Sequence, residues 1–306
     1  MKNKMSNRIK ATGIKVVKGL EKFVVLHEDF TGLIDMISKS TGEMFGGRLQ
    51  ELTTDRIDDA SYEFKQRKEE VTKLLFDNIE RIYGKDWKKK IRKNRIKENT
   101  GAKLETGEEI RLSQDEAYYL YNQYKDPANH PGFETKYGEG YKEIMDKITK
   151  FLKPEVKEWA DWQVDVLFPE LYKRYNEVYK RIHRTNMPWN SKYAGRIKRQ
   201  DVDLEPLDLL EANTKYATSI GGASTKMRIK NAKAIEEVNG NDMLFTYLQD
   251  MEFFAAYAEP LRDIDKILKN KDIRNAIKMT GGEQALTYAE KILDKVATRG
   301  IDKGGE

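Results

Sequence analysis

The stretch KPEVKEWADWQVDVLFPELYKRYNEVYKRIHRTNMPWNSKYAGRIKRQ, residues 153–200, is richer in aromatic side chains than any other window of the chain. Apolar residues recur in it at steps of three and four, first over 156–167 and then over 171–182, which predicts two helices with one apolar face each. Pro169 lies between them, so the join is either a kink or a fresh helix start. After His183 the pattern stops, and residues 186–190 predict an ordered turn.

The aromatic residues of this stretch are candidates for a hydrophobic core or an interface. Large aromatic side chains within an apolar stripe most often form a core, and a groove that binds a partner is the alternative. The candidate core or interface residues are Trp159, Trp162, Tyr172, Tyr175, Tyr179 and Trp189.

The composition favours long, exposed helices. Of the 306 residues, 35% are charged, 39% are hydrophobic and only 7 are proline. With 16 Tyr and 11 Phe, the chain is too aromatic to be disordered, and it is too charged for a compact enzyme with a deep core. The length suits one large or two modest domains. The chain has no cysteine, which excludes disulfides, thiolate metal sites and cysteine nucleophiles.

The charge distribution favours acidic partners. The net charge of +5 is mildly basic and falls short of a dedicated nucleic-acid coat. Residues 1–22 carry seven Lys or Arg and one acid, so they are either a solvated terminus or an electrostatic arm. This start lacks the apolar core of a secretory signal, and no apolar run reaches the roughly 20 residues that span a bilayer.

Residues 85–97, KDWKKKIRKNRIK, predict a short amphipathic helix that is strongly basic. A solvated face anchored by Trp87 is one interpretation, and contact with phosphate groups or a membrane surface is the other. The candidate nucleic-acid or phosphate contacts are Lys85, Lys88, Lys89, Lys90, Arg92, Lys93 and Arg95.

Helix signals fill most of the N-terminal half. Apolar stripes predict a helix over 20–42 and a longer one from about Thr53, with Thr53 or Thr54 as its cap, to Tyr83, where Gly84 provides a stop. The all-polar middle of the longer helix, residues 65–70, indicates a helix that projects into solvent or packs along a narrow seam.

Between 98 and 112 the pattern changes, and two short segments flanked by Gly101 and Gly107, residues 103–104 and 110–112, predict a small β-hairpin. Ser113 and Glu116 then form a capping-box signature for a further helix. Residues 126–133 predict a loop, and a helix follows over about 140–152.

The C-terminal half continues with helices. Residues 200–224 resemble a linker, and a strong apolar stripe returns from Asp242, an expected N-cap, until Pro260 limits that helix. Two shorter helices are expected around 270–272, and a last helix follows the turn at Gly281 and Gly282. We therefore predict a mainly α protein: an extended basic helical arm over 1–97, a connecting hairpin or linker over 98–112, and a multi-helix bundle over 113–306.

No catalytic constellation rises above background. The three histidines are far apart in sequence and match no zinc spacing, and the chain has no phosphate-binding loop and no nucleophile elbow. Glu155, Glu158, Asp161 and Asp165 align along one helix, where a solvated acidic edge is the simplest interpretation. We therefore predict no catalytic residue, no metal ligand and no cofactor, while a deep pocket near Glu158 and Asp161 would favour an enzyme.

Three segments of the chain resemble a helical domain of large polyvalent and ejected virion proteins of tailed, crAss-like phages. The resemblance covers about 110–300, with Trp189 where the family has Tyr and Gly195 where Pro is usual. The matching positions are Leu112, Gln114, Asp115, Ala117 and Leu120, then Glu170, Leu171, Tyr172, Asn176, Val178 and Tyr179, then Asn186, Pro188, Tyr193 and Arg199.

This resemblance implies a non-enzymatic virion component, a packaged cargo or ejection protein or a fragment of one. It is expected in the virion, in the interior of the capsid or tail. It is also expected in the host cytoplasm, to which it is delivered or in which it is made. Expected partners are portal, tail or capsid-interior proteins, further copies of the chain, and DNA at the basic segments. The alternative is a nucleic-acid-binding or scaffold module that acts in the infected cell.

Overall fold

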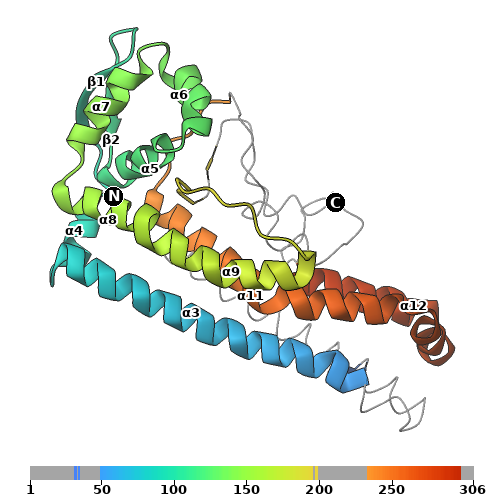
Figure 1. The fold of residues 1–306 in the computed structure, drawn as a ribbon. Helices are drawn as coiled ribbons and strands as arrows, with labels where there is room; N and C mark the ends of the chain where they lie inside the picture. The colour runs from blue at the N-terminus through green and yellow to red at the C-terminus, as the bar shows by residue number, and fades with distance from the viewer. Residues whose placement is uncertain (1–30, 33, 35–48, 196, 199–232, 298–306) are drawn as a thin grey trace, which may run out of the picture. The chain divides into compact units, whose positions relative to one another are not determined.

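The computed structural model describes residues 31–32, 34, 49–195, 197–198 and 233–297, and these are mainly helical (Figure 1). A π-helical turn, Gln163–Leu167, joins two of the helices, and a 3-10 turn covers Pro127–Asn129. The described helices are α3 (Thr54–Tyr83), α4 (Trp87–Lys93), α5 (Gln114–Tyr124), α6 (His130–Tyr137), α7 (Tyr141–Phe151), α8 (Pro154–Trp162), α9 (Phe168–His183), α11 (Gly240–Lys269) and α12 (Lys271–Ala297).

The predicted β-hairpin is present, so the expectation of a mainly α protein with one small hairpin is confirmed. Strands β1 (Glu98–Lys103) and β2 (Glu109–Leu112) pair antiparallel, and the register shifts between Asn99 and Lys103. Gly101 lies in this irregular part with a φ of 76°, a left-handed conformation that glycine adopts without strain. Ala102, Ile110 and Leu112 turn one face of the hairpin into the core.

The chain divides into two compact units, and the boundary falls within α3 and within α11. One unit takes Gln66–Asp208 with Gly221–Ala255, and the other takes Met1–Lys65, Leu209–Ile220 and Ala256–Glu306. The first of these, here called the large unit, contains the hairpin and all of α4 to α9. The domain limits expected at 97 and 112 stay a prediction.

Helix α3 covers the expected range and buries one stripe of side chains. Its C-terminal part places Val71, Leu75, Ile79 and Tyr83 in the core of the large unit, each at most 4% exposed. Gly84 ends the helix with a φ of 75°, and its N–H donates to the Glu80 carbonyl at 2.8 Å, as expected for a glycine stop.

Thr53 and Thr54 do not cap α3, contrary to expectation. Their hydroxyls donate to the carbonyls of Leu49 and Gln50, at 2.6 and 3.2 Å, because a helical stretch already precedes them. A threonine hydroxyl within a helix commonly makes this bond to the preceding turn.

The long aromatic stretch forms α8, the π-helical turn and α9 in direct succession. The prediction of two helices is confirmed, but Val166, which belongs to the apolar repeat over 156–167, is 41% exposed. The π turn holds an extra residue and rotates the helix face, so Val164 is buried in place of Val166, while Leu167 is buried as expected. Pro169 stands in the first turn of α9, where its missing N–H leaves no hydrogen bond unmade.

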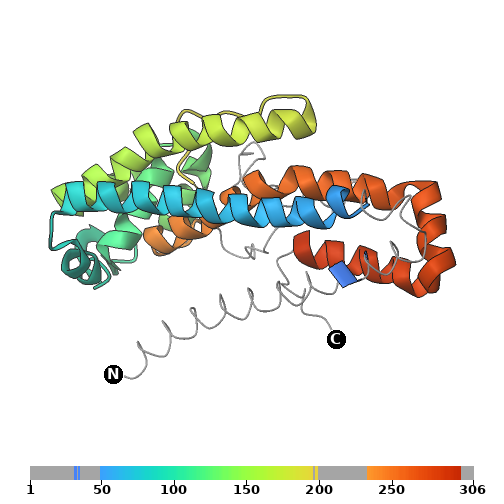
Figure 2. The ribbon, with the colours of Figure 1, turned by 90° about the horizontal axis from the view of Figure 1, so that it is seen from below.

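Three further expectations were wrong. Residues 130–133, predicted as loop, begin the short helix α6, which packs against α7. Helix α11 continues through Pro260 to Lys269, and its cap is Asn239 rather than Asp242, since the Asn239 side chain accepts a hydrogen bond from the Asp242 N–H at 3.0 Å. The Gly282 turn is confirmed by its φ of 73°, and α12 changes direction there (Figure 2).

The remaining expectations concern residues that the structure does not describe. The basic start (1–22), most of the helix expected over 20–42 and the linker over 200–224 lie outside the described residues. Ile34 is the described exception, since it is helical and 1% exposed.

The smaller unit has its own core. In its described part, Phe64 and Tyr257 meet edge to face with their ring centroids 6.1 Å apart. The buried apolar residues of that part include Ile57, Ala60, Leu261, Ile264, Leu268, Ile277, Leu286, Ala289, Ile292, Leu293 and Val296.

Candidate functional site

Helix α4 begins after the Gly84 turn and carries most of the predicted basic contacts. Its apolar side is anchored by Trp87, whose ring centroid lies 5.5 Å from that of Phe76 in α3. The Nζ atom of Lys88 lies 5.3 Å from the centroid of the Trp87 ring, a cation–π contact. The rest of the helix surface is open, because no residue of α4 is buried.

Four of the predicted basic residues share one face of the helix. Lys88 and Arg92 are four positions apart, and so are Lys89 and Lys93, a spacing that places both pairs side by side. Together with Ile96, which is 59% exposed, these four line an open depression. We call the four cations the α4 basic face.

Six cations of residues 85–93 are not neutralised within the described part of the chain. No carboxylate of the described residues lies within 4.0 Å of Lys85, Lys90 or any member of the α4 basic face, although basic residues elsewhere, such as Arg81 and Lys97, form ion pairs. Lys85 and Lys90 are exposed as well. Six neighbouring positive charges therefore face solvent, where an external anion can reach them.

Arg95 behaves differently from the other six predicted contacts. Its Nη2 atom donates to Asp242 Oδ1 at 3.1 Å, and its Nε atom lies 3.9 Å from Asp115 Oδ2. It does not line the depression of the basic face. The structure thus brings together Lys88, Lys89, Arg92 and Lys93, and it assigns Arg95 to a network inside the large unit.

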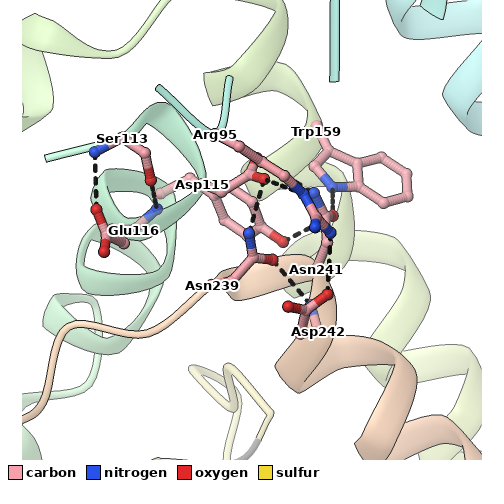
Figure 3. A network of polar contacts seen from close by, with 9 residues as sticks. Arg95, Ser113, Asp115, Glu116, Trp159, Asn239, Asn241 and Asp242 are labelled. Atoms are coloured by element: carbon pink, nitrogen blue, oxygen red, sulfur yellow. Dashed lines mark hydrogen bonds and ion pairs between the residues drawn. The ribbon is translucent and has the colours of Figure 1, made fainter. Parts of the chain in front are cut away.

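The centre of that network is the carboxylate of Asp115, which is fully buried in the first turn of α5 (Figure 3). Asn239 Nδ2 donates to Asp115 Oδ2 at 3.0 Å, and Asn241 Nδ2 donates to Asp115 Oδ1 at 3.2 Å. Burial raises the pKa of Asp115 to about 6, although the hydrogen bonds from both asparagines and the charge of Arg95 act in the opposite direction.

Asn241 extends the network to two other helices. Its Oδ1 atom accepts hydrogen bonds from the Tyr118 hydroxyl at 2.9 Å and from Trp159 Nε1 at 3.1 Å. The Asn241 amide nitrogen thus donates to Asp115, and its oxygen accepts from the Tyr118 hydroxyl and the Trp159 indole N–H. These bonds tie the start of α11 to α5 and α8. Sequence reasoning missed this network, because Asp115 fits equally well as an acid in the first turn of a helix.

The start of α5 is held by the capping box that the sequence predicts. The Glu116 N–H donates to Ser113 Oγ at 3.2 Å, and the Ser113 N–H donates to Glu116 Oε2 at 2.8 Å (Figure 3). This cap fixes the first turn of α5 and with it the position of Asp115.

A second buried carboxylate, Glu252 of α11, lies between α3 and α9. It accepts a hydrogen bond from the Tyr175 hydroxyl at 2.7 Å, and Arg67 Nη1 lies 3.9 Å from its other oxygen. Burial raises the pKa of Glu252, while the Tyr175 hydrogen bond and the charges of Arg174 and Arg67 lower it. Arg174 also pairs with Glu70 at 2.8 Å, so the polar middle of α3 forms ion pairs within the large unit.

The predicted aromatic residues divide into three groups. Trp159 and Trp162 are buried and stack with centroids 5.1 Å apart, and Tyr175 is buried as well. Tyr172 and Tyr179 are half-buried. Trp189 is 48% exposed, and its ring centroid lies 4.3 Å from that of Tyr172.

Glu158 and Asp161, on the acidic edge of α8, pair with neighbouring side chains. Glu158 accepts from Arg81 Nη1 at 2.9 Å, and both side chains are more than half exposed. Asp161 accepts from the Tyr121 hydroxyl at 2.8 Å and from Lys125 Nζ at 2.5 Å. Among the described residues, no group of three or more histidine or acidic side chains is arranged to hold a metal ion.

Comparisons with known proteins add no relative. No protein-family model, no curated protein sequence and no solved structure matches the chain. In the described part of the chain, no helix is both long enough and apolar enough to cross a membrane.

Proposed function

We propose that the protein is a non-enzymatic helical component of a tailed-phage particle, packaged with the DNA, and that α4 contacts the phosphate groups of nucleic acid. The observation that carries the nucleic-acid contact is the set of six exposed cations, on α4 and at Lys85, that have no carboxylate partner among the described residues. A polyanion binds such a surface with the most favourable free energy, because no internal ion pair has to be broken first.

The shape of this surface suits a phosphate backbone better than a small ligand. The depression at the α4 basic face is open, and its walls are long, flexible side chains rather than fixed donors. Point charges on flexible stems track a phosphate backbone without reading its base sequence. We therefore expect binding to double-stranded DNA that depends on salt and not on base sequence.

The resemblance of residues 110–300 to ejected virion proteins supports the place in a particle. On this proposal, portal, tail or capsid-interior proteins and other copies of the chain are the protein partners, and the protein passes to the host with the DNA. The alternative, a nucleic-acid-binding protein that acts only in the infected cell, uses the same α4 surface and differs in where the protein is found.

Binding is tested by fluorescence anisotropy with a labelled DNA duplex over a series of salt concentrations. The test variant replaces Lys88, Lys89, Arg92 and Lys93 by Glu and should lose most of its affinity and its salt dependence. The control variant makes the same charge change at four exposed lysines that are spread over α7 and α9: Lys142, Lys147, Lys173 and Lys180. If both variants bind alike, net charge rather than the α4 basic face explains any affinity.

Location is tested by mass spectrometry of purified phage particles before and after DNA ejection. A packaged and ejected protein is present before ejection and lost afterwards, whereas a fixed structural part remains in the emptied shell. A protein that never occurs in the particle contradicts the virion proposal, and the DNA-binding measurement then decides the alternative on its own.

A further inference from the structure

Four buried side-chain atoms of the large unit have no hydrogen-bond partner among the described residues, and two of them belong to residues that line the same cavity. These two are the acceptor Oδ1 of Asn122 in α5 and the donor Nε2 of Gln163 at the start of the π turn. Both side chains are only 2% exposed, so bulk water does not satisfy them. An unpaired buried polar atom is costly, and two around one cavity call for a shared partner.

The cavity has room for one water molecule. Its volume is about 10 Å³, and it lies where α5, the π turn, the Ala194–Gly195 segment and the start of α11 meet. A water molecule needs about this volume and at least two polar partners. It can donate to Asn122 and accept from Gln163 at once, which no apolar ligand can do.

The walls of the cavity argue against anything larger. Gly240 and Gly195 belong to the wall, and an added Cβ would lie 2.4 Å from Tyr118 Cζ at Gly240 and 3.1 Å from Phe168 Cζ at Gly195. The neighbouring hydroxyls already have partners, since the Tyr118 hydroxyl donates to Asn241 and the Tyr119 hydroxyl accepts from the Lys198 N–H at 2.7 Å. Burial raises the pKa of Tyr118, and the Gln163 side chain, which lies near the Tyr118 hydroxyl, acts to lower it, but Gln163 Nε2 makes no well-aligned hydrogen bond there.

We propose that a single ordered water molecule is bound in this cavity and bridges Asn122 Oδ1 to Gln163 Nε2. The water joins α5 to the π turn between α8 and α9, two elements whose amide side chains do not bond to each other directly. It is a structural ligand of the core, and it exchanges with solvent only when the large unit opens locally.

The bridge predicts that Asn122 and Gln163 are coupled in stability. In Asn122→Leu or Gln163→Met, the water loses one of its two partners, and the remaining amide is left without a well-held hydrogen-bond partner. Each variant should therefore lower the folding equilibrium constant about tenfold. The double variant removes both polar atoms, and its folding equilibrium constant should fall by clearly less than the product of the two single effects. Urea unfolding of the four proteins measures this, and strictly independent effects would contradict the bridge.

Water itself is counted by oxygen-17 magnetic relaxation dispersion, which detects molecules that stay bound for long times. Wild-type protein should hold one more such water than the double variant. The control is Asn129→Leu, which removes a buried amide that donates directly to the Gln123 carbonyl at 2.9 Å and should leave the water count unchanged.

A third measurement needs no variant, and so it stands even if a substituted protein fails to fold. In wild-type protein, the Gln163 side-chain amide protons should show magnetisation transfer from a long-lived water molecule. An equal count in wild type and double variant, or no transfer to the Gln163 amide, would overturn the proposal.

Discussion

The hydroxyl of Tyr175 donates a hydrogen bond of 2.7 Å to the carboxylate of Glu252, and neither residue is more than 1% exposed. This contact joins α9 to α11 at a point where α3 contributes Arg67. A buried charge of this kind is destabilising when it loses a partner, and it can specify how neighbouring helices align.

Tyr175→Phe should therefore destabilise the protein by about 2 kcal/mol at neutral pH, because the buried carboxylate loses its closest donor. Tyr175 stabilises the charged form of Glu252, so the effect should shrink as the pH falls through the raised pKa of Glu252, which lies above the ordinary 4.5 of a glutamate, because the folded group is then protonated. Urea unfolding at several pH values measures this. Tyr62→Phe, at a tyrosine that is 65% exposed, is the matched control and should have little effect.

The Asp115 network predicts a pH dependence of its own. Burial raises the pKa of Asp115 from 3.8 to about 6, so the folded chain binds this proton more tightly than the unfolded chain does. The resulting stabilisation is complete below the unfolded pKa and is lost as the pH rises through the folded pKa.

As the pH rises from 3.8, the unfolded pKa of Asp115, to about 6, its folded pKa, wild-type protein should lose about 3 kcal/mol of unfolding free energy relative to Asp115→Asn, which cannot titrate. Equilibrium unfolding of both proteins across this pH range tests the prediction. Asp146→Asn, at an exposed acid of α7, should follow the wild-type curve. A constant difference between wild type and Asp115→Asn would show that Asp115 titrates at an ordinary value.

Arg92 and Arg95 lie three residues apart and should have different roles. Arg92→Ala should reduce the slope of log affinity for DNA against log salt by about 0.9, the amount expected for one lost phosphate contact. Arg95→Ala should leave that slope unchanged and lower the unfolding free energy by about 1 kcal/mol, since it removes the ion pair with Asp242. Equal effects of the two substitutions on the salt slope would contradict this division.

Ser113→Ala should destabilise the protein by about 1 kcal/mol, because the capping box at the start of α5 loses its side-chain acceptor. Thermal or urea unfolding measures the loss. Ser191→Ala, at an exposed serine in a turn, is the matched control, and a similar loss there would show that the cap itself contributes little.

Gly240→Ala should be clearly more damaging than Gly140→Ala. An added Cβ at Gly240 meets the Tyr118 ring at 2.4 Å, whereas the same atom at Gly140 meets nothing within 4 Å. Overpacking of this kind typically reduces stability by about 1–3 kcal/mol. Near-ultraviolet circular dichroism, which reports on the packing of aromatic rings, should change only in the Gly240 variant.

Local features were predictable from the sequence because each depends on neighbouring residues. The repeat of apolar side chains predicted α3, α7 and α9, Gly84 predicted the end of α3, and the pair Ser113 and Glu116 predicted the start of α5. The errors also have local causes. The π turn rotated Val166 out of the core, and Asn239, three residues before the expected cap, took over that role.

The sequence by itself determined the helical class, the small hairpin and the cluster of positive charge on α4, because these follow from residue spacing and from the kinds of side chain in one short segment. Only the tertiary structure decided which polar groups become buried together. Asp115 receives its hydrogen bonds from residues more than 120 positions away, and Glu252 receives its own from 77 positions away. The periodic pattern of one helix contains no information about such partners, since the free energy of a buried charge depends on the donors that other helices bring to it.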